Sequence, residues 1–368
     1  MTVGLFRAIS TEIQIILLTT AASIAIIAVP KPLKLSSVER YLVAASVVLF
    51  IYTYTLSPFV GRSIVQAFYF FSTVVLYLAC KKALELEKDN TFNYMRSALL
   101  AFVTLHALAL VVLYTNSPVR ATGLMEDYSQ AALLILFAFI ISYPDLKSKP
   151  HFTTLTLVLF LGFFCTFSRS VNFLLILTIA ALFGFEWRHG NIKHILKPTL
   201  IIIGCLGFAY GYPALTDNET VDRGGLRDIG SLNSRTLYWE SAWDAIKQKP
   251  IVGHGLGNFE WTGIKEIRPF KAIHHVHNDY LQVWHDLGVF WLLLLVVSIA
   301  ILLFKTTPKQ VFTPPDRRLT LEVEQRYAGW LALICMVLYM TINFALYSIP
   351  LLTALVLCCL NLRCDRRD

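Results

Sequence analysis

Charged residues are scarce in this sequence, and paired cysteines are absent. Of its 368 residues, 15% are charged and 56% are apolar, whereas an ordinary soluble domain carries about 25% charged residues. The mean hydropathy is +0.60. The seven cysteines lie within apolar runs or at their ends, and no C-x-x-C pair occurs. These absences exclude a water-soluble enzyme, a disordered chain and a small scaffold held together by disulfides.

Alternating segments of about ten residues, which a membrane β-barrel needs, are also absent. The apolar residues instead form continuous runs. Because lipid tolerates only helices or closed barrels, these runs predict an all-α polytopic membrane protein with 11–12 transmembrane helices. Eleven runs lie near residues 13–29, 41–60, 63–80, 97–115, 127–143, 153–168, 171–187, 198–212, 289–304, 327–344 and 347–362.

The connecting segments alternate in charge. One set holds 20 of the 32 Lys and Arg residues with a net charge of +9, and the other set has a net charge of −1. By the positive-inside rule the basic set is cytoplasmic. We therefore expect an N-terminal transmembrane bundle (1–212), an outer catalytic loop (213–288), and C-terminal transmembrane helices with a cytoplasmic tail (289–368). The N-terminus lies outside with eleven spans, and inside if residues 1–29 hold a second span. Without a basic stripe carrying interleaved aromatics, we expect no nucleic-acid partner.

The outer loop contains two motifs that could carry chemistry. The first, Gly253 to Gly257 in a G-x-G-x-G pattern, follows a predicted helix over residues 237–246 that Pro250 ends. It lacks the strand and spacing of a dinucleotide site, so we expect a tight turn rather than a phosphate cradle. The second contains His274, His275 and His277, but its spacing does not suit zinc, and we expect no metal.

His277 is the strongest catalytic candidate. Asn278 and Asp279 precede an amphipathic segment, which predicts a helix that begins there with one of them near the cap. The helix dipole and nearby arginines would disfavour the imidazolium, so we expect the pKa of His277 to be lowered. A neutral imidazole at the membrane surface is a competent general base.

Three arginines on the outer side have no evident structural purpose. Arg169 lies between two apolar runs, Arg235 begins the predicted loop helix, and Arg120 follows an earlier run. A snorkelling or solvated side chain is the plain alternative for each. Guanidinium forks match phosphate oxygens bidentately, and no pair of clustered carboxylates accompanies them. This pattern favours a diphosphate leaving group over a glycoside hydrolase.

These residues resemble the O-antigen ligase/polymerase superfamily of membrane glycosyltransferases. The resemblance covers mainly residues 166–170 and 233–291, with a weaker similarity at 120–131. His277, Asn278 and Gly288 fit the ligase signature, whereas Trp291 departs from its last position, where a small residue or Tyr is usual. The N-S-R-x-L-Y-W and P-x-x-G-x-G-x-G-N-F segments are also similar. Family members usually have twelve spans, so the fold implied is a GT-C-like helical membrane protein.

The resemblance implies a specific reaction at the periplasmic face of the bacterial inner membrane. Such a ligase transfers a glycan from undecaprenyl diphosphate to the lipid A-core oligosaccharide, with inversion and without a metal or other cofactor. His277 would be the base that deprotonates the acceptor. Arg169 and Arg235 would act in catalysis and hold the diphosphate, and Arg120, Asn278 and Asp279 would contribute to substrate binding. The implied partners are these two lipid-linked substrates and the membrane lipids.

Two other functions are compatible with the sequence. A related O-antigen polymerase or protein O-oligosaccharyltransferase would share the His and Arg chemistry and differ in its acceptor. A non-enzymatic lipid or glycan transporter would need polar residues at mid-membrane. His106 and Asn343 are among the few polar residues placed deep in apolar runs, and we interpret both as helix-packing residues.

Overall fold

The protein is described here by a computed structural model. It describes residues 20, 22–24, 26, 34–86, 88–116, 121–122, 125, 127–215, 230–264, 275–308, 320–346, 348, 351–353 and 355–356. Within these residues all regular secondary structure is helical, which confirms the predicted all-α class. The chain forms two compact units, one of residues 1–92, 230–302 and 340–356, and the other of residues 93–229, 303–339 and 357–368.

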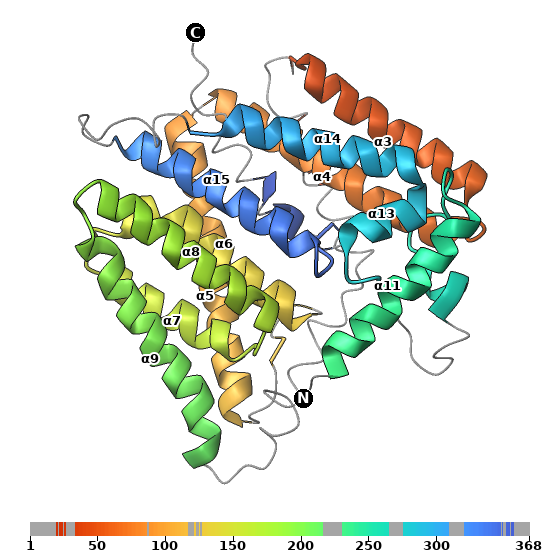
Figure 1. The fold of residues 1–368 in the computed structure, drawn as a ribbon. Helices are drawn as coiled ribbons and strands as arrows, with labels where there is room; N and C mark the ends of the chain where they lie inside the picture. Colours follow the sequence, from red (N-terminus) through yellow and green to blue (C-terminus); the bar gives the residue numbers. More distant parts are fainter. Residues whose placement is uncertain are drawn as a thin grey trace. The chain divides into compact units, whose positions relative to one another are not determined.

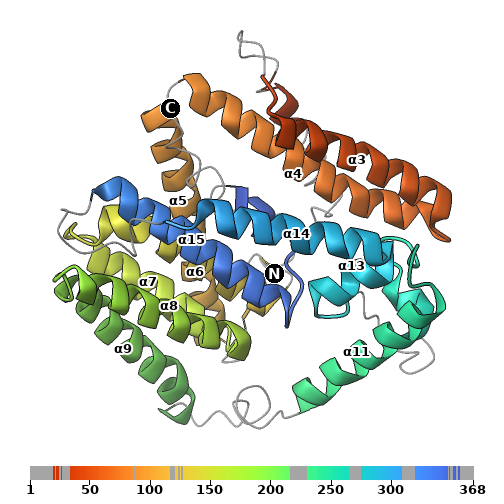
Figure 2. The same cartoon turned by 45° about the horizontal axis from the view of Figure 1, so that its top comes forward.

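The first unit contains the helices of the predicted outer loop and three of the helices that pack around them. Its elements are α3 (Ser37–Leu56), α4 (Val60–Leu86), α11 (Gly230–Gln248), the π-helix η1 (Glu260–Ile264), α13 (Asp279–Leu287) and most of α14 (Val289–Thr306). A capping box between Ser36 and Glu39 begins α3. α3 packs along α4, and α11 packs on α13 and η1, as Figures 1 and 2 show for the α3–α4 pair.

The second unit is built around α6 (Tyr128–Leu146), whose residues 129–144 are buried. Around it lie α5 (Lys88–Asn116), α7 (Phe152–Phe164), α8 (Arg169–Arg188), α9 (Lys193–Leu215) and α15 (Leu321–Met340). α7 packs on both α6 and α9, and α8 packs on α6 and α9. Gly162 permits the close approach of α7 to α5, because a Cβ there would lie 2.6 Å from the Cα of Ala107.

Six helices among the described residues are long and apolar enough to cross a membrane, in α4, α5, α6, α8, α9 and α14. α7 is a shorter apolar helix, and α3 and α15 coincide with two further predicted runs. The protein is therefore a polytopic helical membrane protein, as predicted. The runs at 13–29 and 347–362 lie largely outside the described residues, so the predicted total of 11–12 spans stays a prediction.

Contacts at the ends of the apolar runs and in their connections are compatible with the predicted alternation of sides. Each joins positions that the charge pattern assigns to the same face of the membrane. On the predicted outer face, the contacts are Ser63 Oγ to Leu256 O at 2.6 Å and Ala121 N to Cys165 O at 3.1 Å. On the predicted cytoplasmic face, they are Arg96 to Asp145, Lys147 to Glu186 and Glu324 at 2.8 Å each, and Lys81 to Glu39 at 2.7 Å.

Candidate catalytic site around His277

Helix α11 supplies one wall of the site. The predicted helix over 237–246 is present and begins earlier, at Gly230, and it ends at Gln248, before Pro250. Tyr238 and Ala242 lie on its buried face and pack against Phe259 and Val276. This cluster fixes α11 against the residue that precedes His277.

The glycine-rich turn packs closely against α13. Gly253, Gly255 and Gly257 have φ values of +66°, +87° and +68°, which favour glycine. A Cβ on Gly253 would lie 2.6 Å from the backbone of Asp286 in α13. The amides of His254 and Gly255 donate to the carbonyls of His285 and Asp286 at 2.8 Å each. These amides are already engaged by α13, which supports the tight turn that we expected in place of a phosphate cradle.

Asp286 is the centre of a buried polar network beneath the site. Its carboxylate is fully buried and accepts from Gly257 N at 3.0 Å and from Gln282 Nε2 at 3.0 and 3.1 Å. It also lies 2.7 Å from His285 Nδ1, while His285 Nε2 lies 2.7 Å from Thr262 Oγ1. Gln282 Oε1 in turn accepts from Val276 N at 2.7 Å. The network therefore links the glycine-rich turn to the residue beside His277.

A second histidine, His254, extends this network. Its ring stacks on that of His285 with centroids 4.9 Å apart, and its Nε2 lies 2.7 Å from the carbonyl oxygen of Ala245 in α11. Burial lowers the pKa of His254. A neutral His254 therefore serves to fasten α11 to the turn.

Helix α13 begins as predicted, with Asn278 as its N-cap. The Asn278 side chain accepts from Leu281 N at 3.0 Å and donates to the carbonyl oxygen of Thr341 at 2.9 Å. Asp279 is fully buried and accepts from the amides of Ala345 at 2.7 Å and Leu346 at 3.3 Å. The start of α13 is thus bonded to residues 341–346, a non-helical segment that follows α15.

His277 itself is held on three sides. Its Nδ1 lies 3.1 Å from Asn343 Oδ1. Its ring stacks on Tyr238 with centroids 5.8 Å apart and meets Phe344 edge-on at 5.1 Å. An amide oxygen only accepts, so Nδ1 carries the proton and Nε2 carries the lone pair. This arrangement selects the tautomer that a general base at Nε2 requires.

Backbone strain coincides with the predicted site residues. Among the described non-glycine residues, positive φ occurs at His277 (+58°) and Phe167 (+49°), and Phe167 lies two residues before Arg169. Such conformations cost of order 1–3 kcal/mol and cluster at functional sites. Thr166 and Ser168, on either side of Phe167, are buried, and Ser168 N donates to Thr166 Oγ1 at 3.3 Å. The strain is held in place by packing at both positions.

The three arginines differ in their setting. Arg235 is half-buried on α11, one turn before Tyr238, so the two side chains share the helix face that reaches His277. Arg169 begins α8 in the second unit, with Ser168 as its N-cap, and is exposed. Arg120 lies outside the described residues. The convergence of Arg169 and Arg120 with His277 stays a prediction.

Asn343 was missed as a site residue because it was interpreted as a helix-packing residue within an apolar run. That interpretation is wrong: α15 ends at Met340, and Asn343 lies in the following segment, where it contacts His277. The available signal was the position of this amide next to the predicted outer end of the run at 327–344. His106, by contrast, is buried within α5 and stacks on Phe102. Among the residues that the structure describes, no group of three His, Cys, Asp or Glu side chains could hold a metal ion.

A comparison with known protein families gives a match for the segment from α7 to α14. Residues 154–296 match the family model described as O-antigen ligase. This match confirms the resemblance that the sequence motifs indicated. The matched segment includes Arg169, Arg235, His277 and Gly288, whereas Asn343 lies beyond it. No curated protein matches the chain.

The O-antigen ligase match supports an enzyme of the membrane glycosyltransferase type, with ligase or polymerase chemistry on a lipid-linked glycan. One position of the ligase signature differs in this chain: Trp291 stands where a small residue or Tyr is usual. Trp291 packs against Tyr52 of α3, with ring centroids 6.2 Å apart. The larger ring is therefore accommodated against the neighbouring helix α3.

Gly288, a signature residue of O-antigen ligases, is expected to tolerate no side chain. Its φ is +86°, and a Cβ would overlap the carbonyl of Ile251. We expect Gly288→Ala to lower the free energy of unfolding by at least about 1–3 kcal/mol, from backbone strain with steric overlap added. Thermal unfolding in detergent measures this loss. Gly204→Ala is the matched control, because Gly204 is helical with open space around it, and should be neutral or stabilising. Equal effects would contradict the prediction.

Asp279 should make stability depend on pH. Burial raises its pKa to about 7, against about 3.9 in an unfolded chain. Between these values the folded state binds more protons than the unfolded state, so this contribution to stability falls as pH rises. Asp279→Asn keeps an acceptor for Ala345 and Leu346 and removes the titration. We expect the stability of the variant relative to wild type to increase from pH 5 to pH 8, by about 2–3 kcal/mol.

The measurement is the difference in thermal unfolding midpoint between the two proteins at each pH. Taking this difference removes the pH dependence that other titrating groups, including His254, contribute equally to both proteins. Parallel midpoint curves for Asp279→Asn and wild type would show that Asp279 does not titrate in this range.

Proposed function

We propose that this protein is an O-antigen ligase of the bacterial inner membrane. In this proposal it transfers a glycan from undecaprenyl diphosphate to the lipid A-core oligosaccharide at the periplasmic face, with inversion and without a metal. The observation that carries the proposal is the setting of His277: a strained histidine, enclosed by two aromatic rings, whose Nδ1 is bonded to Asn343. The family match in the same segment supports it.

In the proposed reaction His277 acts through Nε2. The acceptor hydroxyl loses its proton to Nε2 as its oxygen attacks the anomeric carbon of the donor sugar. The bond between that carbon and the diphosphate oxygen breaks, and undecaprenyl diphosphate leaves with the electron pair. The imidazolium that forms is stabilised at Nδ1–H by Asn343. Diphosphate is a stable anion, so no strong general acid is required.

The arginines would balance the charge on the leaving group. Arg235 would bind the diphosphate from α11, and Arg169, at the start of α8, would complete the set together with Arg120. Planar guanidinium groups suit phosphate oxygens and stabilise charge that develops during departure. Asn278 and Asp279 would position the site, because both bond to the 341–346 segment that carries Asn343. The loop 213–288 would thus be the catalytic part between two sets of transmembrane helices.

The test of function combines a cellular and a purified assay. Deletion of the gene should remove every glycan-capped species of lipopolysaccharide while leaving lipid A-core intact. The purified protein in detergent should transfer glycan from the lipid-linked donor to lipid A-core. A single-repeat cap in the deletion strain would instead indicate a polymerase. Absence of any transfer by the folded, purified protein would contradict an enzymatic role.

Arg235→Ala should reduce kcat/KM for the donor by about 10²-fold, the typical loss when one charge-stabilising donor is removed. Arg235→Lys should restore part of it, since Lys supplies the charge without the planar fork. Lys247→Ala on the same helix is the matched control, because Lys247 forms only an exposed pair with Asp244. Unchanged donor kinetics in Arg235→Ala would remove this residue from the proposed site.

A further inference from the structure

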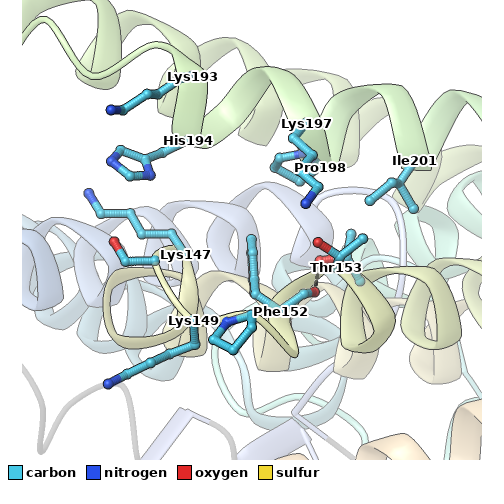
Figure 3. A pocket seen from close by; sticks show the side chains of 12 residues that line it. Lys147, Lys149, Phe152, Thr153, Lys193, His194, Lys197, Pro198 and Ile201 are labelled. Carbon is cyan, nitrogen blue, oxygen red and sulfur yellow. Dashed lines mark hydrogen bonds between the residues drawn. The ribbon is translucent and has the colours of Figure 1, made fainter.

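A cavity of about 430 Å³ lies at one end of the second unit. It is enclosed by the connection between α6 and α7, the first turns of α7 and the first turns of α9 (Figure 3). The lining residues are Lys147, Ser148, Lys149, Pro150, Phe152, Thr153, Thr156, Lys193, His194, Lys197, Pro198 and Ile201. The cavity is distant from Arg169, the predicted site residue of this unit. Arg169 begins the 20-residue helix α8, whereas the cavity adjoins the start of α9, which follows the other end of α8. A helix of this length spans about 30 Å.

The charge of this cavity is positive and uncompensated at three positions. Lys147 is balanced by Glu186 and Glu324, each 2.8 Å from its Nζ. Lys149, Lys193 and Lys197 are exposed, and none has an ion pair with a carboxylate among the described residues. No Asp or Glu lines the cavity. In Figure 3, Lys197 extends from α9 toward the α7 side, Lys193 lies at the edge of the space beside His194, and the side chain of Lys149 points away from α9.

The backbone adds to this positive potential. α7 and α9 both begin at the cavity, and the N-terminus of a helix favours anions. The N-cap of α7, His151, makes no side-chain capping bond. The hydroxyl of Thr153, in the first turn of α7, also lines the space. One volume is therefore surrounded by lysines from two segments and by the N-termini of two helices. Such groups bind phosphate oxyanions.

Part of the cavity lining is apolar. Phe152 and Pro198 are buried, and Ile201 lies two turns along α9 from Lys193. The outward face of α9 exposes Leu196, Leu200 and Ile203 by 51%, 64% and 57%, as expected of a helix in contact with lipid. A free phosphate would use only the charged end, whereas a phospholipid would use both.

We propose that this cavity binds the phosphate headgroup of an anionic phospholipid, with Lys149, Lys193 and Lys197 on the phosphate oxygens and an acyl chain against Ile201. The four lysines belong to the connecting segments that the charge pattern assigns to the cytoplasm, where basic pockets between transmembrane helices bind such headgroups. This lipid site is separate from the proposed transfer reaction, because none of the residues that line the cavity is assigned to that reaction.

Lipid binding to the purified full-length protein tests the proposal. In detergent, phosphatidylglycerol should raise the thermal unfolding midpoint and should appear as a bound lipid by native mass spectrometry, whereas phosphatidylcholine should do neither. Replacing both lysines of α9, Lys193→Gln with Lys197→Gln, should weaken phosphatidylglycerol binding by about 30-fold, since each Lys near an anionic lipid contributes about a factor of five. Millimolar inorganic phosphate should neither reproduce nor compete for the effect.

A matched double variant, Lys34→Gln with Lys305→Gln, removes the same charge from two exposed residues on the same predicted side that do not line the cavity. It should bind phosphatidylglycerol like wild type. An equal loss in both double variants would mean non-specific attraction, and competition by inorganic phosphate would mean a free-anion site; either result overturns the proposal. Independently of any variant, phosphatidylglycerol should protect Lys193 and Lys197 of the wild-type protein from acetylation and leave Lys34 reactive, and failure of that protection also overturns it.

Discussion

Replacing His277 with alanine is expected to reduce glycan transfer by about 10²- to 10⁴-fold, the range that positioned general bases contribute. The acceptor hydroxyl would keep its proton until late in the reaction, because the variant lacks the base that the mechanism assigns to it. Donor binding should be retained, since the diphosphate is assigned to the arginines. The expected signature is therefore a loss in kcat with little change in the apparent affinity for the lipid-linked donor.

The test needs three measurements: the unfolding midpoint of His277→Ala, its transfer rate, and the transfer rate of a control variant. The thermal unfolding midpoint of His277→Ala should stay close to wild type, because alanine removes a ring that is only half-buried. His151→Ala is the matched control: His151 is exposed and makes no side-chain capping bond, so its transfer rate should equal that of wild type. If folded His277→Ala protein caps lipid A-core at the wild-type rate, the proposed mechanism is wrong.

Replacing Asp286 with alanine is expected to destabilise the first unit by about 3–5 kcal/mol. Asp286 is fully buried, and its loss would leave Gly257 N, Gln282 Nε2 and His285 Nδ1 without their acceptor. A buried donor without a partner costs about 1–3 kcal/mol, and breaking a buried charged network has a cost of similar total size. Transfer activity should fall with it, because Gln282 also holds the backbone beside His277.

The measurement is the thermal unfolding midpoint in detergent, with limited proteolysis of the outer loop as a second readout. Asp244→Ala serves as the control, since Asp244 lies on α11 and its pair with Lys247 is exposed to solvent, where ion pairs contribute about 1 kcal/mol or less. Equal midpoints for Asp286→Ala and Asp244→Ala would show that the network does not contribute to stability.

The sequence predicted the helices well because lipid imposes a simple rule on them. Most apolar runs coincide with a helix, for example 97–115 with α5 and 171–187 with α8. Their ends were predicted less well. α4 continues to Leu86, past Lys81 and Lys82, because helical hydrogen bonding does not stop at the membrane surface. α15 ends at Met340 rather than near 344, because residues 341–346 bond to α13 instead.

The site was predicted as far as local signals extend. The start of α13 at Asn278 follows from its own neighbouring residues, and His277 precedes that helix by consequence. Asn343 and Asp286 could not be assigned roles in the same way. Asn343 meets His277 from 66 positions along the chain, and Asp286 meets Gly257 from 29 positions away. Such pairings are set by tertiary packing, which hydrophobic periodicity does not encode.

The left-handed backbone at position 277 has a consequence for how this protein can diverge. Glycine and asparagine adopt that conformation with less strain than other residues, so the local chain would be more stable with either of them. We therefore expect histidine to be maintained at this position by the need for its imidazole. A descendant that no longer requires the reaction is therefore expected to drift first to Gly or Asn at this position, with its fold intact, which would make such a change a marker of lost activity.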